Sequence, residues 1–225
     1  MDTAGYKVGG FMNKQLDGFN KFYKDSKMEY PIDMVINFLE KRYSMLDYDT
    51  RKNIKALDVG FGPGNNLKGL LDYGFLTYGI DYSEVCVNQV KEKYGHYENI
   101  REVWGGDVLS CKIKETFDVI LCTGTIFLNP LDEIEKILDI LYNLLNSSNG
   151  YGNMLINFCL GDVDEYTCYP FLKNLDKVQL LTFPTMKKLL ENANFVIENI
   201  EYTYYEKIIE NRAYKRYWFE VKKNN

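Results

Sequence analysis

The chain has 225 residues, of which 46% are hydrophobic and 26% charged, and its formal net charge is −5. These are values of a globular protein long enough to form one domain over residues 1–225, and the acidic balance disfavours a general nucleic-acid binder. Five cysteines without a C-x-x-C pair favour free thiols in a reducing compartment, and a single histidine disfavours a histidine-based metal site. Because no segment resembles a signal peptide or a bilayer span, we expect a cytoplasmic protein without membrane contact.

The first predicted element is an N-terminal helical arm within residues 1–50. Residues 1–12 are glycine-rich, and from Asn13 to Asp47 apolar residues recur at helical spacing on both sides of a Tyr30-Pro31 pair. Because proline is favoured in the first turn of a helix, Pro31 predicts the start of a second helix.

A glycine-rich turn follows the first predicted strand. Residues 53–66 read NIKALDVGFGPGNN, a short apolar run typical of a buried parallel strand and then Gly60, Gly62 and Gly64. Glycine lets the backbone turn tightly and approach a ligand, and a helix starting at Asn65 would present free N–H groups to that ligand. Strand, glycine turn and helix are typical of the opening of a nucleotide-binding α/β unit.

The glycine spacing separates two classes of nucleotide-binding protein. A dinucleotide fingerprint, G-x-G-x-x-G, counted from Gly60 would require glycine where the chain has Asn65. The chain instead has D-x-G-x-G-x-G from Asp58 to Gly64. This pattern resembles motif I of the class I S-adenosylmethionine-dependent methyltransferases, and an ordinary tight turn is the alternative.

The second predicted strand, over residues 75–80, ends in Asp81. An acidic residue about 20 positions beyond the glycines can accept hydrogen bonds from both hydroxyls of a ribose. The stretch from Gly79 to Ser83 resembles motif II of the same family. The alternative is that Asp81 or Ser83 caps a helix predicted over residues 84–94.

The resemblance extends to two further strand ends. Gly106, Asp107 and Val108 follow a strand predicted over residues 101–104 and match the family's Gly-Asp pair, which binds adenine; a plain turn is the alternative. A strand over residues 117–121 ends before Cys122, where ligands lie in open α/β sheets. The cofactor-binding residues that the resemblance implies are Asp58, Gly60, Phe61, Gly62, Gly64, Asp81, Tyr82, Gly106, Asp107, Val108, Cys122, Thr123 and, from the arm, Tyr30.

The rest of the chain continues the alternation of strands and helices. We expect a helix from Leu131 to Leu145, a strand over residues 154–160, an irregular acceptor-side insertion over 161–183, a helix over 184–192 and two final strands. This order predicts an α/β fold with a mostly parallel, doubly wound sheet. The resemblance implies a Rossmann-like sheet of seven strands with an antiparallel C-terminal strand, and an N-terminal helical arm that covers the site.

The sequence offers no obvious general base. Methyl transfer requires alignment of donor and acceptor, and a base is needed only when the acceptor proton must leave early. The weak catalytic candidates are Tyr23 and Tyr43 in the arm and Asp162 and Asp164 in the insertion. Because no histidine is suitably placed, we expect an acceptor with a free lone pair, such as an amine.

The acceptor is expected to be a small molecule. Arg212, Lys215 and Arg216 in the last hairpin are either solvated charges or recognise an anionic group such as a phosphate or carboxylate. The segment after the fourth strand lacks the Asn/Asp-Pro-Pro-Tyr/Phe motif of nucleobase-amino methyltransferases, which disfavours nucleic acid as a substrate.

The resemblance therefore implies S-adenosylmethionine-dependent methylation of a small molecule by a monomer or homodimer. N-methylation of an amino sugar or a phosphorylated amine is favoured over O-methylation. Two alternatives stay open: an NAD(P)-dependent oxidoreductase with a degenerate fingerprint, and a non-catalytic subunit that binds S-adenosylmethionine for a partner.

Overall fold

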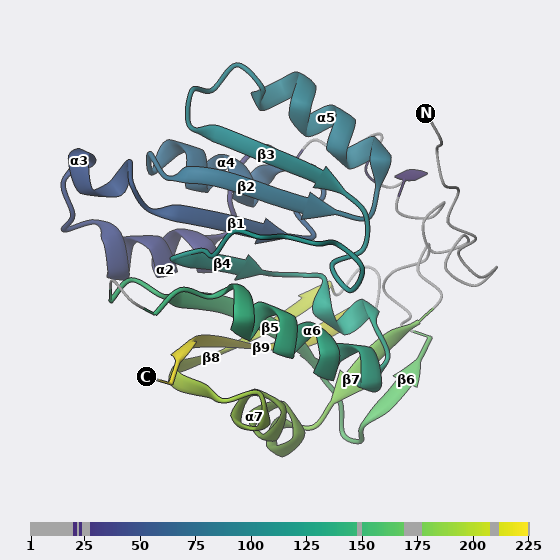
Figure 1. Cartoon of the computed structure of the whole chain (residues 1–225). Helices are drawn as coiled ribbons and strands as arrows, with labels where there is room; N and C mark the ends of the chain where they lie inside the picture. The colour runs from purple at the N-terminus through teal and green to yellow at the C-terminus, as the bar shows by residue number, and fades with distance from the viewer. Residues whose placement is uncertain are drawn as a thin grey trace.

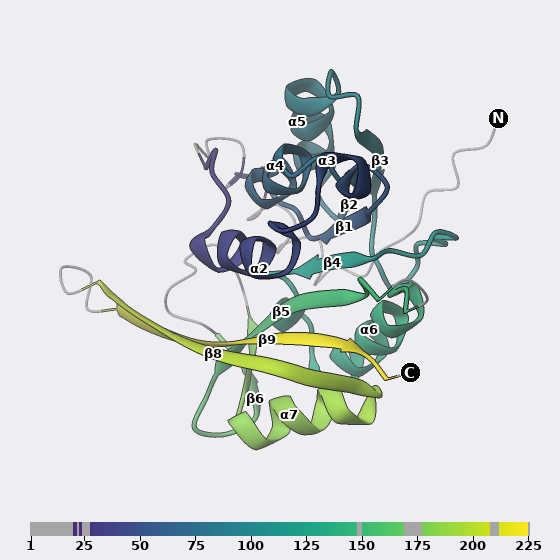
Figure 2. The ribbon, with the colours of Figure 1, turned by 90° about the vertical axis from the view of Figure 1, so that its left-hand side faces the viewer.

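One mixed β-sheet forms the middle layer of the protein, with helices on both of its faces (Figures 1 and 2). The computed structural model describes residues 20, 21, 23, 28–147, 150–168, 177–207 and 212–224. The strands are β1 (Lys55–Val59), β2 (Leu76–Asp81), β3 (Ile100–Gly105), β4 (Val119–Cys122), β5 (Asn153–Leu160), β6 (Glu165–Thr167), β7 (Val178–Leu181), β8 (Phe195–Lys207) and β9 (Arg212–Lys223). The helices are α2 (Asp33–Tyr43), α3 (Tyr48–Arg51), α4 (Asn65–Asp72), α5 (Glu84–Tyr94), the short 3₁₀ helix η1 (Ile126–Leu128), α6 (Leu131–Leu144) and α7 (Phe183–Asn192).

The parallel core of the sheet has the strand order β3-β2-β1-β4-β5. The long β9 pairs antiparallel with β5 over Asn153–Cys159, and β8 pairs with β9. Because β9 occupies one edge of β5, the other edge is shared by β4 and, further along, by β7. The predicted mostly parallel sheet with an antiparallel C-terminal strand is confirmed. Strands β6 and β7, which lie beyond the end of β4, raise the number of described strands from the predicted seven to nine.

Several element boundaries differ from those predicted. The insertion over residues 161–183 is more regular than expected, because its two ends pair as β6 and β7. Strand β4 begins at Val119 rather than at Phe117, which forms only an isolated bridge to Leu145. Helix α2 begins at Asp33, after Pro31, and most of the predicted arm before residue 28 lies outside the described residues.

Side chains that alternate along the strands build two apolar layers. Leu57 and Ile120 belong to the cluster that packs against α6 and α7, whereas Ala56 and Leu121 face the cluster that includes α2. Strands buried on both faces read as continuous apolar runs, which is why they were recognisable in the sequence.

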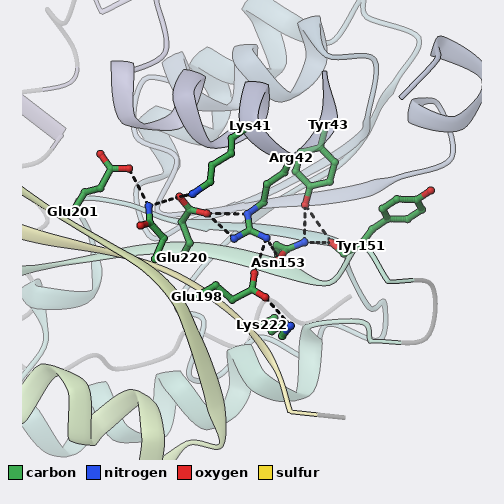
Figure 3. A network of polar contacts seen from close by, with 10 residues as sticks. Lys41, Arg42, Tyr43, Tyr151, Asn153, Glu198, Glu201, Glu220 and Lys222 are labelled. Carbon is green, nitrogen blue, oxygen red and sulfur yellow. Dashed lines mark hydrogen bonds and ion pairs between the residues drawn. The ribbon is translucent and has the colours of Figure 1, made fainter. Parts of the chain in front are cut away.

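A polar network binds α2 to the C-terminal strands (Figure 3). Arg42 donates to Glu220 at 2.6 and 2.9 Å and forms an ion pair with Glu198 at 2.6 Å. Lys41, which is more exposed, contacts Glu220 at 3.1 Å. Burial opposes ionisation of Glu220, but hydrogen bonds from Asn199, Arg42 and Lys41 outweigh it and lower its pKa. The guanidinium is therefore the main counter-charge of a buried carboxylate and holds α2 on the sheet.

Replacing this guanidinium should destabilise the fold strongly. We expect Arg42→Met to lower the free energy of unfolding by about 3 kcal/mol, because it leaves a buried carboxylate with little compensation. The matched change Lys41→Met removes an exposed partner of the same carboxylate and should cost less than about 1 kcal/mol. Urea unfolding of both variants measures the difference, and equal effects would contradict the role assigned to Arg42.

Candidate functional site

A cavity lies at the carboxyl ends of β1, β2 and β4, where the glycine turn, the end of β2 and the segment after β4 meet. Ligands of open α/β sheets bind at this edge. Of the residues singled out in the sequence, those that line the cavity are Tyr23, Gly60, Asp81, Tyr82, Gly106, Asp107, Val108 and Cys122.

The three glycines of the turn have positive φ angles, from +53° to +83°. Only Gly60 lines the cavity, and a Cβ there would lie 2.4 Å from the Thr125 hydroxyl oxygen. Gly62 donates its N–H to Asp81, and Gly64 precedes α4 with no room for a Cβ beside Val90. Gly62 and Gly64 therefore shape the turn, and Gly60 borders the cavity.

Asp81 receives hydrogen bonds from the glycine turn and from the residue that caps α5. Its Oδ2 accepts from the Gly62 N–H at 2.7 Å and its Oδ1 from the Ser83 N–H at 2.8 Å. Burial raises the pKa of Asp81 despite these two bonds. The cap of α5 is Ser83, whose hydroxyl accepts from the Cys86 N–H, so the Asp81 carboxylate is not used as the cap. Each carboxylate oxygen has a second lone pair with which to accept from a ligand.

Asp58 lies behind the cavity wall rather than in it. Its side chain is 1% exposed, and burial together with the nearby Asp81 raises its pKa to about 8. The Leu67 amide donates to this carboxyl, while Oδ2 has no hydrogen-bond partner among the described residues. A cationic ligand in the cavity would favour the ionised form of Asp58.

Asp107 follows the third strand of the parallel core. Its Oδ1 accepts from the Leu109 N–H at 2.9 Å, and the preceding Gly106 donates its N–H to the Asp81 carbonyl at 2.9 Å. The carboxylate is thereby oriented at the cavity edge, next to the backbone of Val108.

Tyr23 is the candidate catalytic residue that the structure brings to the cavity. Its ring lies against the glycine turn, 3.2 Å from the position that a Cβ of Gly62 would occupy. Burial and the nearby Asp81 raise the pKa of the Tyr23 phenol. The phenol therefore keeps its proton near neutral pH and suits a hydrogen-bond donor better than a base.

Two tyrosines predicted for the site lie away from the cavity. Tyr43 is buried in the core beside Phe75, and its hydroxyl donates to the Tyr151 carbonyl. Tyr30 has an 81% exposed side chain. These positions follow from packing of the arm, because α2 turns Tyr43 into the sheet while Tyr30 precedes that helix.

The two acidic candidates in the insertion are also outside the cavity. Asp162 is exposed. Asp164 accepts from the Thr182 N–H at 2.6 Å and from the Thr185 hydroxyl at 2.5 Å, at the start of α7. Burial opposes ionisation of Asp164, but these bonds outweigh it and lower its pKa. In the described contacts, the Asp164 carboxylate thus binds two threonines at the start of α7.

Two predicted cofactor-binding residues take part in packing or in hydrogen bonds outside the cavity lining. Phe61 is 3% exposed and packs in the cluster with α5. Thr123 accepts from the Asn66 side-chain amide at 3.0 Å. Cys122 does line the cavity, and burial followed by the nearby Asp58 raises the pKa of its thiol, which argues against a thiolate nucleophile.

An asparagine pair at the start of α4 was not recognised in the sequence. Asn66 accepts from the Ile32 N–H at 3.1 Å, and Asn65 donates to the Tyr30 carbonyl at 3.1 Å. These contacts bind the arm to the strand ends around the cavity. The only sequence signal was two adjacent asparagines after the glycine turn, which are equally typical of a helix start.

Within the described part of the chain, no three metal-ligating side chains come together as a metal site. None of the described helices is long and apolar enough to cross a membrane.

The comparisons with known proteins find methyltransferases. Residues 56–148 match a family model described as a methyltransferase domain. An uncharacterized methyltransferase from Alkaliphilus oremlandii (strain OhILAs) is 28% identical over 158 residues, or 70% of this chain. That alignment spans 63% of the relative's length, so the relative has a substantial part without a counterpart here.

Solved structures show the same fold at low sequence identity. Magnesium protoporphyrin IX methyltransferase (ChlM) from Synechocystis PCC 6803, with bound SAH, has a TM-score of 0.63 and 18% identity; the match covers 98% of this chain and 90% of that chain. The 1,6-didemethyltoxoflavin-N1-methyltransferase of Burkholderia thailandensis has a TM-score of 0.68 and 15% identity, with 100% and 94% covered.

The raised pKa of Asp58 predicts a pH dependence of stability. In the unfolded chain this carboxyl ionises near pH 4, whereas in the folded protein it keeps its proton up to about pH 8. The folded state therefore binds the extra proton, and its stability falls as the pH rises between these values. We expect Asp58→Asn to remove on the order of 3 kcal/mol of the decline between pH 5 and pH 8.

Urea unfolding of wild type and Asp58→Asn at both pH values measures this difference. Asp162→Asn is the matched control, because that carboxyl is exposed. Parallel pH profiles for wild type and Asp58→Asn would show that Asp58 is ionised in the folded protein.

Proposed function

We propose that the chain is a class I methyltransferase, which uses S-adenosylmethionine, and that it methylates the nitrogen of a small-molecule amine. The observation that carries this proposal is the cavity itself, an acidic pocket between a glycine turn and the carboxyl ends of parallel strands. Its acidic character suits a ligand with a sulfonium and an ammonium group.

The residues present fit this cofactor. Asp81 offers acceptor lone pairs to a ribose diol, and Asp107 with the Val108 backbone offers an acceptor and a donor to adenine. The buried Asp58 carboxyl, whose Oδ2 has no hydrogen-bond partner among the described residues, would become ionised beside a cationic ligand. The cofactor would thus be bound at one end by hydrogen bonds and at the other by charge.

When bound, S-adenosylmethionine supplies an electrophilic methyl carbon, which an amine lone pair attacks while sulfur leaves with its bonding electrons. The protein aligns the two reactants about 3–3.5 Å apart, and alignment of this kind is worth about 7–11 kcal/mol. Tyr23 and Thr125, which line the cavity beside Gly62 and Gly60, would exclude water and restrict the approach of the acceptor.

The cavity favours an amine over an alcohol as the acceptor. An aliphatic alcohol is a poor nucleophile until a base removes its proton, whereas a neutral amine attacks without prior loss of a proton. Among the described lining residues, Asp81 and Asp107 already accept backbone hydrogen bonds, and the phenol of Tyr23 has a raised pKa. None of these groups is suited to deprotonate a hydroxyl, which supports N-methylation.

The non-catalytic subunit and the oxidoreductase, which are the two alternatives, predict different results in transfer and binding assays. We would incubate the full chain with S-adenosylmethionine labelled on its methyl group and matched pairs of amines and alcohols. Label transfer to amines but not to their alcohol twins is the expected result, and equal transfer would contradict the preference for nitrogen. Tight S-adenosylhomocysteine binding without any transfer would favour the non-catalytic subunit, and NAD binding would favour the oxidoreductase.

Removing the Asp81 carboxylate should weaken cofactor binding. We expect Asp81→Ala to raise the Kd for S-adenosylhomocysteine by more than about tenfold, which is 1.4 kcal/mol. Asp162→Ala removes an exposed carboxylate elsewhere and should leave the Kd unchanged. Calorimetric titration measures both, with circular dichroism to check folding, and an unchanged Kd in Asp81→Ala would restrict this residue to holding the glycine turn.

A further inference from the structure

Strands β5 and β9 present one row of side chains to the N-terminal arm. Asn157 lies opposite Trp218, and Cys159 lies opposite Arg216. Directly opposed residues of antiparallel strands point to the same face, as do residues two apart in one strand. Leu155 and Trp218 pack in the cluster that contains α2. All of these side chains therefore lie on the arm-facing side of the sheet.

The two ends of this row differ in what they contact. At one end, Glu220 and Asn153 accept hydrogen bonds from Arg42, which binds α2 to the sheet (Figure 3). At the other end, toward the carboxyl end of β5, the row continues with Asn157 and Arg216. The end with Asn153 and Glu220 therefore binds the arm. The end with Asn157 and Arg216 lies beyond α2, on the side of the cavity.

Asn157 has a buried donor without an acceptor in the part of the chain that the structure describes. Its side chain is 0% exposed, and its Oδ1 accepts from the N–H of Gly124, a residue that lines the cavity, at 2.8 Å. This bond fixes the orientation of the amide, and Nδ2 then has no hydrogen-bond partner among the described residues. A buried donor in this state destabilises the protein unless a ligand or water accepts from it.

Arg216 brings a positive charge to the same region. Its guanidinium carbon lies 5.0 Å from the centre of the Phe127 ring, next to cavity residues of η1. It also hydrogen-bonds the Cys159 thiol. Its charge opposes the rise in the pKa of Tyr23, so its field extends to a residue of the cavity wall.

We infer that Arg216 and Asn157 bind the methyl acceptor, and that the acceptor carries a carboxylate or phosphate group. This inference rests on the proposed function and names the substrate class of that site. A guanidinium and an amide N–H are the donors that such anions require. The cofactor end of the site contains the carboxylates of Asp81 and Asp107, which would repel an anion. The charges thus orient the acceptor with its anionic group away from the cofactor.

Matched probes test this assignment in the full chain saturated with S-adenosylhomocysteine. We would titrate phosphoethanolamine against ethanolamine, and β-alanine against 3-aminopropan-1-ol, and follow the indole N–H signal of Trp218 by NMR. The chain has two tryptophans, so the signal is readily assigned. We expect the anionic member of at least one pair to bind about tenfold more tightly than its neutral twin.

Arg216→Gln should abolish this preference without changing the affinity for S-adenosylhomocysteine, and Arg216→Lys should retain part of it. Lys215→Gln is the matched control, because it removes the same charge from the neighbouring, exposed position on β9 and should keep the preference. Asn157→Leu, which replaces the donor by an apolar group of similar size, should weaken binding of the anionic probes.

Three results would overturn the inference. If S-adenosylhomocysteine binds but the anionic and neutral probes bind equally, or Arg216→Gln keeps the preference, only the acceptor assignment fails. If S-adenosylhomocysteine does not bind to the wild type, the proposed function fails and the acceptor assignment fails with it.

Discussion

The hydrogen bond from the Gly62 amide to the Asp81 carboxylate, at 2.7 Å, joins the glycine turn to the end of β2. A second bond, from the Gly60 N–H to the Ile80 carbonyl at 2.8 Å, fixes the same two segments. Both donors sit at positive φ angles, which glycine adopts without strain, and Gly60 also leaves room for Thr125. The shape of the cavity therefore depends on backbone geometry that other residues would distort.

The carboxyl groups around the cavity illustrate a conflict between stability and binding. Asp58 is almost fully buried, and among the described residues its Oδ2 has no hydrogen-bond partner. Burial of this carboxyl is unfavourable to its ionised form and raises its pKa. A cationic ligand would reverse the penalty. The arm is bound independently of this site, through the Arg42 network at one end and Asn66 at the other. The protein thus holds α2 and the residues before it against the sheet with contacts that do not involve the ligand.

Local patterns predicted what local geometry determines. The buried strands, the glycine turn and the position of Asp81 could be read from the sequence, because apolar runs and glycine spacing reflect short-range constraints. Tyr43 and Asp164 were misplaced because their surroundings come from distant segments: β5 and its preceding residues for Tyr43, and the start of α7 for Asp164. The role of Asn157 could not be predicted from the sequence. Its Oδ1 accepts from the distant Gly124, and this contact leaves Nδ2 without a partner among the described residues.

The central claim is that the cavity binds the adenosyl moiety of an S-adenosylmethionine-type cofactor. Calorimetric titration of the purified chain with S-adenosylhomocysteine, beside a parallel titration with NAD, tests it most directly. The account predicts a saturable heat of binding at micromolar concentration for S-adenosylhomocysteine and none for NAD. Binding of NAD without binding of S-adenosylhomocysteine would contradict it and would require every site residue assigned from the glycine turn to be reassigned.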